Sequence, residues 1–252
     1  MTVAATTVGP RLAGRRLLVT GASSGIGRAV ATAAAEEGAS LALVARSRDD
    51  LADLADLLPG DHVVVPCDLR DLAAAAAAVD TAADALDGLD GVVNAAGVAR
   101  PENILAADPE GWRAMFEVNV LGLLAVTQAA VRRMGDTGTR DVVLISSMSG
   151  RRRGSTEFSV YAASKHAVHC IGDGLAAECT PHGIRVLLVS PGYVATPIFR
   201  HDEHHTDRAD DFDDLVHEVG LQPEAVAEQV VHALARPGDV RVVEVALTSM
   251  DQ

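Results

Sequence analysis

A tyrosine and a lysine stand four residues apart in "SVYAASKHAV", residues 159–168, with only small residues between them. On a helix, positions i and i+4 lie on one face, so the side chains of Tyr161 and Lys165 are expected to point the same way. A fixed ammonium lowers the pKa of a neighbouring phenol from its ordinary value near ~10 and makes proton transfer feasible at neutral pH. The alternative is a solvated surface pair without a role. The elements around the pair decide between these interpretations.

Apolar, β-branched runs alternate with Ala-rich helical stretches along the whole chain. The runs are residues 16–20, 41–45, 62–67, 90–97, 141–147 and 184–192, with a last one in "VVEVALTSMDQ". Continuous apolar strands alternating with helices indicate a parallel sheet that is covered on both faces. The sequence therefore predicts an α/β fold in a single domain over residues 1–252, of which 1–13 are expected to be flexible.

The composition restricts the possible partners. The chain has 252 residues, a formal net charge of −14 and 48% hydrophobic residues, enough for the core of one domain. Nucleic acid and anionic membranes would repel this charge, so neither is expected as a partner. Its three cysteines form no CxxC pair, and no stretch has the pattern of a signal peptide or membrane span. We expect a soluble cytoplasmic protein.

A glycine-rich turn, "VTGASSGIGRAV", joins the first predicted strand to the first predicted helix. Gly21, Gly25 and Gly27 follow a G-x-x-x-G-x-G spacing. Glycines there allow a tight turn and a close approach of a pyrophosphate to the amides at the helix N-terminus. Ser23 and Ser24 add hydroxyl donors. The alternative is an ordinary turn capped by serine, but the strand before it and the helix after it favour a phosphate-binding turn.

Together these motifs resemble the short-chain dehydrogenase/reductase family, in its single-domain division. The resemblance covers nearly the whole chain and rests on motifs that occur in the expected order: "TGASSGIG", "CDL", "NAAG", "NV", "ISS", "YAASK" and "PGYVATP". It implies a Rossmann-type doubly wound parallel sheet, a nicotinamide cofactor and an oxidoreductase. One departure is Ala95, which stands where the family often has a second asparagine.

The resemblance also implies a catalytic set. Tyr161 would exchange a proton with the substrate oxygen, Ser147 would hydrogen-bond that oxygen, and Lys165 would hold the nicotinamide ribose. Asn119, a poor helix former inside a predicted helix, would anchor a water in a proton relay; the alternative is an asparagine satisfied by neighbouring backbone. Ser146 competes with Ser147, but strand alternation sends it to the opposite side.

The same resemblance assigns the remaining cofactor contacts. Asp68 would meet the adenine amino group, and Thr196 and the backbone of Val194 would hold the nicotinamide carboxamide. The full predicted cofactor set is Gly21, Ser23, Ser24, Gly25, Ile26, Gly27, Arg46, Ser47, Asp68, Leu69, Asn94, Ala95, Ala96, Gly97, Tyr161, Lys165, Pro191, Gly192, Val194 and Thr196.

Arg46, directly after the second predicted strand, bears on the choice of cofactor. An acidic residue at this point would hold the ribose 2′-hydroxyl of NAD, whereas a guanidinium suits the 2′-phosphate of NADP. Ser47 can donate to the same phosphate, cap the next helix, or both. The sequence therefore favours NADP(H), with NAD-linked oxidation of a secondary alcohol as the alternative.

The substrate is expected to be a small carbonyl or alcohol compound that lies under a lid, residues 197–222. Phe158, Tyr193 and Phe199 are candidates for an apolar wall. Residues 151–153, a run of three arginines, either steer an anionic substrate or form a solvated loop. His201, His204 and His205 match no metal-site spacing, so no metal is expected.

Two helices carry more apolar residues than one sheet face needs, the first from Pro109 to Met134 and the second from Val160 to Cys179. In the resembling family such helices meet their symmetry mates, which implies a homotetramer, or a homodimer if only one contact forms. The alternative is that the surplus packs within the monomer. A non-catalytic dinucleotide-binding regulator on this fold is also possible in principle, but the intact catalytic set argues against it.

Overall fold

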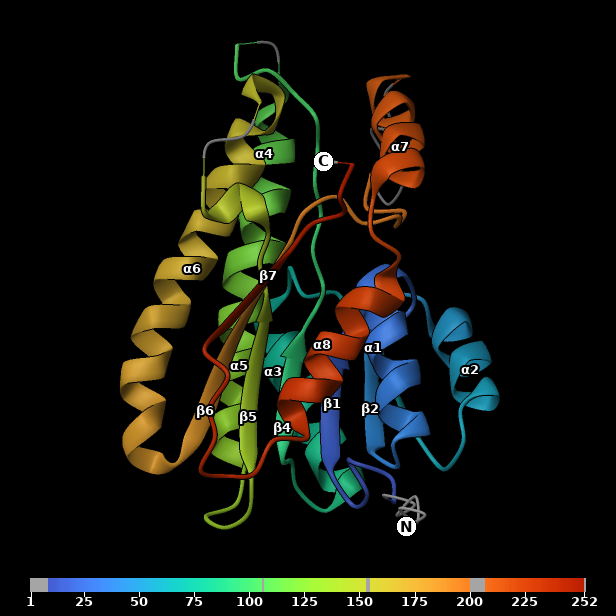
Figure 1. Ribbon diagram of the computed structural model, residues 1–252, viewed down its shortest axis with the longest axis vertical. Coiled ribbons are helices and arrows are strands. Elements are labelled where there is room, and N and C mark those ends of the chain that lie inside the picture. The colour runs from blue at the N-terminus through green and yellow to red at the C-terminus, as the bar shows by residue number, and fades with distance from the viewer. Residues whose placement is uncertain (1–8, 106, 153–154, 200–206, 252) are drawn as a thin grey trace, which may run out of the picture.

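All of the predicted strands meet in one sheet (Figure 1). The computed structural model describes residues 9–105, 107–152, 155–199 and 207–251. The strands are β1 Arg16–Thr20, β2 Ser40–Ala45, β3 Val63–Pro66, β4 Gly91–Asn94, β5 Arg140–Ile145, β6 Ile184–Pro191 and β7 Glu244–Leu247. All neighbouring strands are parallel. The five inner strands β2, β1, β4, β5 and β6 are buried along most of their length because helices cover both faces, whereas the edge strands β3 and β7 are partly exposed.

The strand order is β3-β2-β1-β4-β5-β6-β7, so the chain changes direction across the sheet between β1 and β4. Leu17 of β1 pairs with Leu41 of β2 on one side and Gly91 of β4 on the other. In sheets of this kind ligands bind outside the carboxyl ends of the strands, at the point where the order reverses. The prediction of a Rossmann-type doubly wound sheet in one domain is confirmed.

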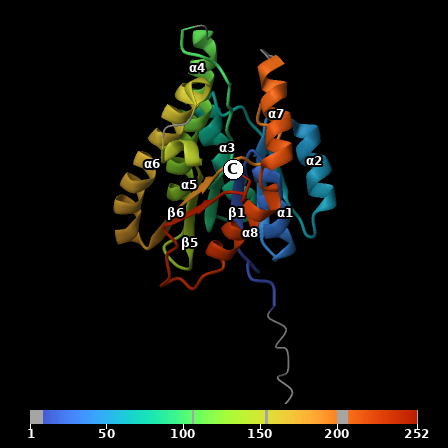
Figure 2. The same ribbon diagram turned by 45° about the horizontal axis from the view of Figure 1, so that its top comes forward.

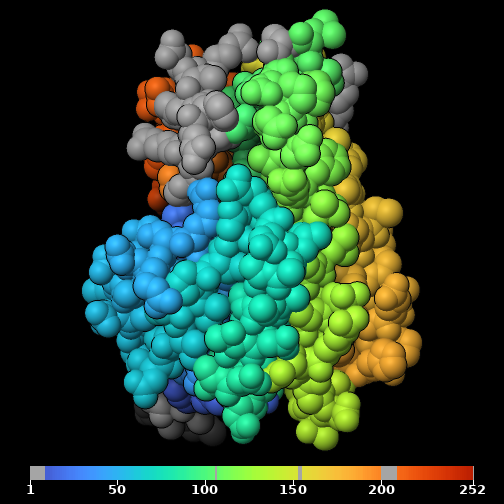
Figure 3. All heavy atoms as spheres, turned by 180° about the vertical axis from the view of Figure 1, so that it is seen from behind, coloured from blue at the N-terminus to red at the C-terminus, as the bar shows by residue number. Residues whose placement is uncertain are grey.

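The helices form one layer on each face. They are α1 Gly25–Glu36, α2 Arg48–Leu57, α3 Leu72–Leu86, α4 Pro109–Phe116, α5 Leu123–Arg133, α6 Ser159–Cys179, α7 Asp207–Val219 and α8 Pro223–Leu234. Side chains of α1, α2 and α8 pack on one face, and those of α3, α5 and α6 pack on the other. Figure 2 separates the two layers, and Figure 3 shows the second one from outside.

The long helix predicted from Pro109 to Met134 is continuous but not uniform. A π-helical segment, Glu117–Gly122, separates α4 from α5. By length and composition the run Pro109–Arg133 would pass as a membrane span, yet half of its most apolar window is buried inside the protein. Its buried residues include Met115 and Val126, which identifies it as a core helix of the sheet.

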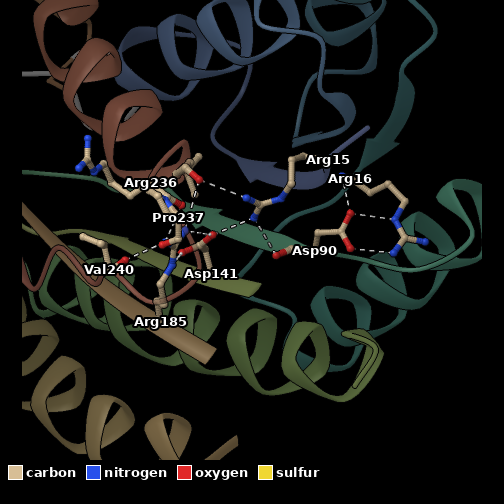
Figure 4. A network of polar contacts seen from close by, with 9 residues as sticks. Arg15, Arg16, Asp90, Asp141, Arg185, Arg236, Pro237 and Val240 are labelled. Atoms are coloured by element: carbon tan, nitrogen blue, oxygen red, sulfur yellow. Dashed lines mark hydrogen bonds and ion pairs between the residues drawn. The ribbon is translucent and has the colours of Figure 1, made fainter. Parts of the chain in front are cut away.

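A buried ion-pair network ties the strands together at their amino ends (Figure 4). Asp141 at the start of β5 accepts hydrogen bonds from Arg185 at 2.8 and 2.9 Å and from Arg15 at 2.8 Å. Arg185 also donates to the carbonyls of Arg236, Pro237 and Val240. These bonds attach the chain between α8 and β7 to the sheet, at the end opposite the cavity described next.

Candidate active site

A cavity of about 1040 Å³ opens at the carboxyl ends of the strands. Its walls include most of the predicted cofactor and catalytic residues: Gly21, Ser23, Ser24, Gly25, Ile26, Gly27, Arg46, Ser47, Asp68, Leu69, Ala95, Ala96, Gly97, Ser147, Tyr161, Lys165, Pro191, Gly192, Val194 and Thr196. Two predicted residues, Asn94 and Asn119, do not line it. Segments far apart in the sequence thus meet at one site.

The glycine-rich turn has the geometry that its spacing predicts. Gly21 has a φ of +68°, in the left-handed region, and a Cβ there would lie 2.9 Å from the backbone of Ala96. A Cβ on Gly27 would lie 2.2 Å from the Gly21 carbonyl oxygen, so α1 can start this close to β1 only with glycine. The turn presents the first residues of α1 to the cavity, which suits a pyrophosphate. The chemistry and size of the cavity therefore fit a dinucleotide.

At the far end of the cavity, Arg46 and Ser47 follow β2. The hydroxyl of Ser47 accepts a hydrogen bond from the Asp50 amide at 3.2 Å, so its capping role is confirmed. Asp50 also lines the cavity, so this end carries a carboxylate as well as the Arg46 guanidinium.

Asp68, predicted to meet the adenine, is bound by Arg70, a residue that none of the sequence motifs includes. Arg70 binds its carboxylate at 2.6 and 2.9 Å. This hydrogen bonding to Arg70, with the charge of Arg46, lowers the pKa of Asp68 although burial opposes the shift. Arg70 lines the same cavity. Its position directly after "CDL" was the only available signal, and nothing in the sequence showed that it turns back onto Asp68.

Tyr161 and Ser147 meet at the opposite end of the cavity. Ser147 hydrogen-bonds the phenol, which lowers the pKa of Tyr161, but burial acts more strongly and raises that pKa to about 12. The downward shift predicted from the Tyr161–Lys165 spacing is therefore wrong for the protein's own groups. The physical reason is that burial disfavours the phenolate, and the lysine does not offset it.

Lys165 lies on the same helix face as Tyr161 but points past it. Its ammonium is 5.8 Å from the centre of the Tyr161 ring and donates to the Ile145 carbonyl at 3.0 Å. The residue is 4% exposed, and burial lowers the pKa of Lys165 to about 8. A Cβ on Gly97 would lie 3.5 Å from the lysine nitrogen, so the "NAAG" turn closes over this ammonium.

Asn119 occupies the π-helical segment and is 1% exposed. Its amide donates to the Val98 carbonyl at 2.9 Å and to Ser164 at 3.0 Å, and its oxygen accepts from the Val98 amide at 2.9 Å. The alternative considered from the sequence, an asparagine satisfied by its neighbours, thus matches these contacts. Single π-helical turns often mark functional sites, because the extra residue redirects a side chain.

The two serines after β5 separate as strand alternation predicts. Ser146 donates to the Lys165 carbonyl at 3.2 Å, on the side of α6. Ser147 faces the cavity and Tyr161, and its oxygen also accepts from the Ser149 amide at 3.1 Å. Both serines line the cavity, but the Ser146 hydroxyl is bonded to the α6 backbone, whereas Ser147 meets the Tyr161 phenol.

A buried threonine, not singled out in the sequence, holds the turn after β4. Thr20 accepts hydrogen bonds from the amides of Ala95 and Ala96, both at 3.1 Å. Asn94 turns away from the cavity and donates to Thr127 of α5 at 3.1 Å. The side chain of Asn94 therefore supports the turn, and Ala95, Ala96 and Gly97 form the wall.

An aromatic cluster closes the cavity beside Tyr161. Phe158 packs edge-on against Tyr161 at 6.3 Å and against Phe212 of α7 at 4.8 Å between ring centres, and Phe199 completes the group. Phe158 and Phe199 belong to the predicted apolar wall, as does Tyr193, which is 40% exposed. Phe212 adds α7, which occupies much of the predicted lid; residues 200–206 lie outside the described part of the chain.

Arg151 and Arg152 do not share one environment, and the lid histidines considered as metal ligands lie outside the described residues. Arg152 lines the cavity, whereas Arg151 pairs with Glu244 at 3.3 Å and Arg153 lies outside the described residues. No group of three or more His, Cys, Asp or Glu residues in the described ranges is placed to hold a metal ion. His201, His204 and His205 fall outside those ranges.

Known proteins share both this sequence pattern and this fold. A family model described as short chain dehydrogenase matches residues 15–207. The chain belongs to the short-chain dehydrogenase family. It is 35% identical over 231 residues to an uncharacterised oxidoreductase of Staphylococcus aureus (strain USA300), and the match covers 91% of this chain and 95% of that relative.

Two solved structures of the family superpose on nearly the entire chain. A short-chain dehydrogenase of Burkholderia cenocepacia J2315 in complex with NADP is 30% identical with a TM-score of 0.79, over 94% of this chain and 97% of that one. A short chain dehydrogenase of Mycobacterium paratuberculosis bound to NAD is 30% identical with a TM-score of 0.80, at the same coverage. The chain is thus an oxidoreductase of this family with a nicotinamide-binding fold.

Proposed function

We propose that this oxidoreductase uses NADP(H) to interconvert a small ketone or aldehyde and the corresponding alcohol. The observation that carries the proposal is the convergence of Ser147, Tyr161 and buried Lys165 at one end of a cavity that the glycine-rich turn also lines. The glycine-rich turn would hold the pyrophosphate of a nicotinamide cofactor, and Lys165 would hold its nicotinamide ribose.

In this proposal the chain's own residues hold the substrate oxygen and move its proton. The nicotinamide, when bound, supplies or accepts the hydride. Ser147 donates a hydrogen bond to the substrate oxygen, and Tyr161 gives that oxygen a proton during reduction or takes it during oxidation. The high pKa that burial gives Tyr161 keeps the phenol protonated, as reduction requires. Lys165, which lies beside the Tyr161 ring, binds the nicotinamide ribose in this proposal.

Arg46 supports NADP(H) over NAD(H). Its guanidinium lines the cavity directly after β2, where the 2′-substituent of the adenosine ribose is expected, and charge-assisted contacts to phosphate are strong. One relative of known structure is described with NADP and another with NAD. The carboxylates of Asp50 and Asp68 at the same end favour NAD, which is the second candidate.

A screen that follows NADPH and NADH consumption across ketones, aldehydes and 3-oxo esters tests the activity.

The first prediction is that Tyr161→Phe lowers kcat by at least about a hundredfold while NADPH affinity changes little, because only the proton donor is lost. Binding of NADPH is measured by fluorescence titration. A variant that keeps most of its turnover would remove Tyr161 from the mechanism.

The assembly and compartment belong to the same proposal. Phe116, Leu121 and Leu124 of the long helix are each more than a third exposed, and we propose that they meet a second copy in a homotetramer or homodimer. The acidic net charge and the three free cysteines suit a cytoplasmic enzyme.

A further inference from the structure

One histidine beneath the active site continues the catalytic stripe of α6. Tyr161, Lys165 and His169 stand at i, i+4 and i+8, so they share one helix face over successive turns. Lys165 donates to the carbonyl of Ile145 at the end of β5. The imidazole of His169, one turn further, meets the backbone of Ser147 and the strands that follow it in the sheet.

His169 belongs to a chain of hydrogen bonds. Its Nε2 lies 3.1 Å from the hydroxyl oxygen of Ser190, and that hydroxyl donates to a carboxylate oxygen of Glu244 at 3.1 Å. Ser190 is fully buried at the end of β6, immediately before Pro191 and Gly192. Arg151 pairs with the same oxygen of Glu244 at 3.3 Å.

The donor and acceptor types fix the direction of this chain. The Ser190 hydroxyl has one hydrogen, which the Glu244 carboxylate takes, so Ser190 must accept from Nε2–H of His169. The other ring nitrogen meets the backbone of Ser147 in a hydrogen bond that raises the pKa of His169, so the ring donates there, and only the protonated imidazolium makes both contacts as donor. A buried hydroxyl with both roles filled holds its neighbours in one arrangement, because breaking either bond leaves a buried polar group unpaired.

The packing leaves the imidazole little room to move. A Cβ on Gly150 would lie 2.7 Å from Cδ2 of His169 and 2.6 Å from the Lys165 carbonyl oxygen. Gly150 ends the short 3-10 turn that begins after Ser147. The ring is thus half-buried and lies against the Ser147 turn and β6.

Groups around the imidazole shift the pKa of His169 in both directions. Burial, the largest effect, lowers the pKa of His169, and Glu244 of β7 raises it. Arg151 of the 3-10 turn and His166 of α6 lower this pKa, whereas the hydrogen bond to the Ser147 backbone raises it.

We propose that His169 is a positioning residue of the active site. Through Ser190 and Glu244 it fixes the turn that carries Ser147 and the start of the Pro191–Gly192 turn relative to α6. It touches neither substrate nor cofactor; it acts on the distance between the Ser147 hydroxyl and the Tyr161 phenol. This inference rests on the proposed function, because it assumes that Ser147 and Tyr161 carry out the reaction.

The test uses the full-length enzyme with NADPH and the most rapidly reduced ketone of the screen. His169→Leu should lower kcat about tenfold with little change in the KM for NADPH, because a small displacement of a catalytic group reduces the rate strongly. His169→Gln, which keeps a donor to Ser190, should recover part of the loss. The control is His166→Leu, which removes an exposed histidine on the same helix and should leave kcat unchanged.

Two further variants decide the result if His169→Leu does not fold. Ser190→Ala and Glu244→Gln should each lower kcat about two- to fivefold at unchanged NADPH affinity. Wild-type kcat in both, or a His169→Leu value within twofold of the control, overturns the inference. Equal losses of kcat, NADPH affinity and thermal stability also overturn it, since they indicate general damage.

A spectroscopic measurement tests the chain without any substrate. In the NMR spectrum of histidine-labelled protein, Glu244→Gln should shift the titration of the His169 Cε1–H signal to lower pH, since the carboxylate raises this pKa. An unshifted titration overturns the chain of contacts. Loss of activity in Tyr161→Phe together with normal activity in His169→Leu would refute this inference alone, whereas full activity in Tyr161→Phe would refute the proposed function.

Discussion

At the scale of single residues, the active site is controlled by burial more than by charge pairing. Tyr161 and Lys165 share a helix face, yet burial raises the pKa of the phenol to about 12 and lowers that of the ammonium to about 8. Each group is therefore driven toward its neutral form. In the protein's own environment the Tyr161 phenol is therefore held in its proton-donating state.

The burial of Lys165 leads to a pH prediction for stability. Its pKa is about 8 in the folded protein against an ordinary 10.5, so between these values the unfolded chain binds more protons than the folded one. The free energy of unfolding should therefore rise with pH in that window, by roughly 1–3 kcal/mol from this residue.

Lys165→Met removes that contribution. Denaturant unfolding of both proteins from about pH 7 to about pH 10 should give a wild-type free energy of unfolding that rises relative to the variant's. The stabilising effect of neutral Tyr161, lost only as pH rises from about 10 toward its folded pKa of about 12, is present in both proteins and largely cancels in the difference. Parallel pH curves for the two proteins would contradict the lowered lysine pKa.

Arg46 gives the prediction on cofactor choice. Arg46→Asp should weaken NADPH binding by roughly ten- to a hundredfold and NADH binding far less, since one charge-assisted contact to phosphate contributes about 1.5–3 kcal/mol. Fluorescence titration with both cofactors measures the ratio. Arg70→Ala serves as a comparison, because Arg70 is bound to Asp68 at the same end of the cavity. Equal losses for NADPH and NADH in Arg46→Asp would refute the assignment.

At the scale of elements, the site depends on how closely the turn after β5 lies on α6. Gly150 makes this contact possible: a Cβ there would lie 2.6 Å from the Lys165 carbonyl oxygen. The π-helical segment has a comparable role on the other side, where Asn119 clamps the backbone of Val98 and the hydroxyl of Ser164. The catalytic helix is thus approached by the backbone of the Ser147 turn on one side and hydrogen-bonded by the Asn119 side chain on the other.

Gly150→Ala should therefore separate the Ser147 turn from α6. Overpacking against backbone atoms costs about 1–3 kcal/mol, and we expect a loss of that size together with reduced turnover. The control is Gly174→Ala on the exposed side of α6, where a Cβ meets nothing within 4 Å. That change should stabilise the helix by about 0.5–1 kcal/mol. Thermal and denaturant unfolding measure both, and a Gly150→Ala protein as stable as the wild type would contradict the close packing.

At the scale of the whole molecule, apolar surface remains after the sheet is covered. Met115, Val120, Leu123 and Val126 of the long helix are buried within the monomer, whereas Phe116, Leu121 and Leu124 are exposed by 38%, 44% and 37%. Val243 and Met250 at the C-terminal end are exposed by 53% and 98%. We propose that each of these two groups meets a second copy, since two independent isologous contacts give a closed tetramer.

Light scattering should accordingly give a mass of about four times the 26.1 kDa of one chain. The double change Leu121→Glu with Leu124→Glu should lower that mass, because two charges would be buried in the contact. Leu57→Glu, on the exposed side of α2, is the control and should leave the mass unchanged. A wild-type mass of one chain would refute the proposal, and twice one chain would leave the dimer.

The sequence by itself determined the fold class, the glycine turn and the set of residues that surround the cavity. Two local causes are Gly27, where a Cβ would meet the Gly21 carbonyl oxygen, and Ser47, which caps its own helix. Strand alternation also predicted the different contacts of the two serines after β5: Ser146 bonds the α6 backbone and Ser147 meets Tyr161.

Only the tertiary structure decided how these residues are charged and what supports them. The pKa of Tyr161 follows from burial by elements distant in sequence, and this burial outweighs the i+4 spacing that suggested the opposite shift. Arg70 on Asp68 and Phe212 beside Phe158 are likewise contacts between side chains whose meeting no motif encodes. His169 shows the same limit: its partners Ser190 and Glu244 lie 21 and 75 positions along the chain, and parallel pairing of β6 and β7 alone brings them under the active site.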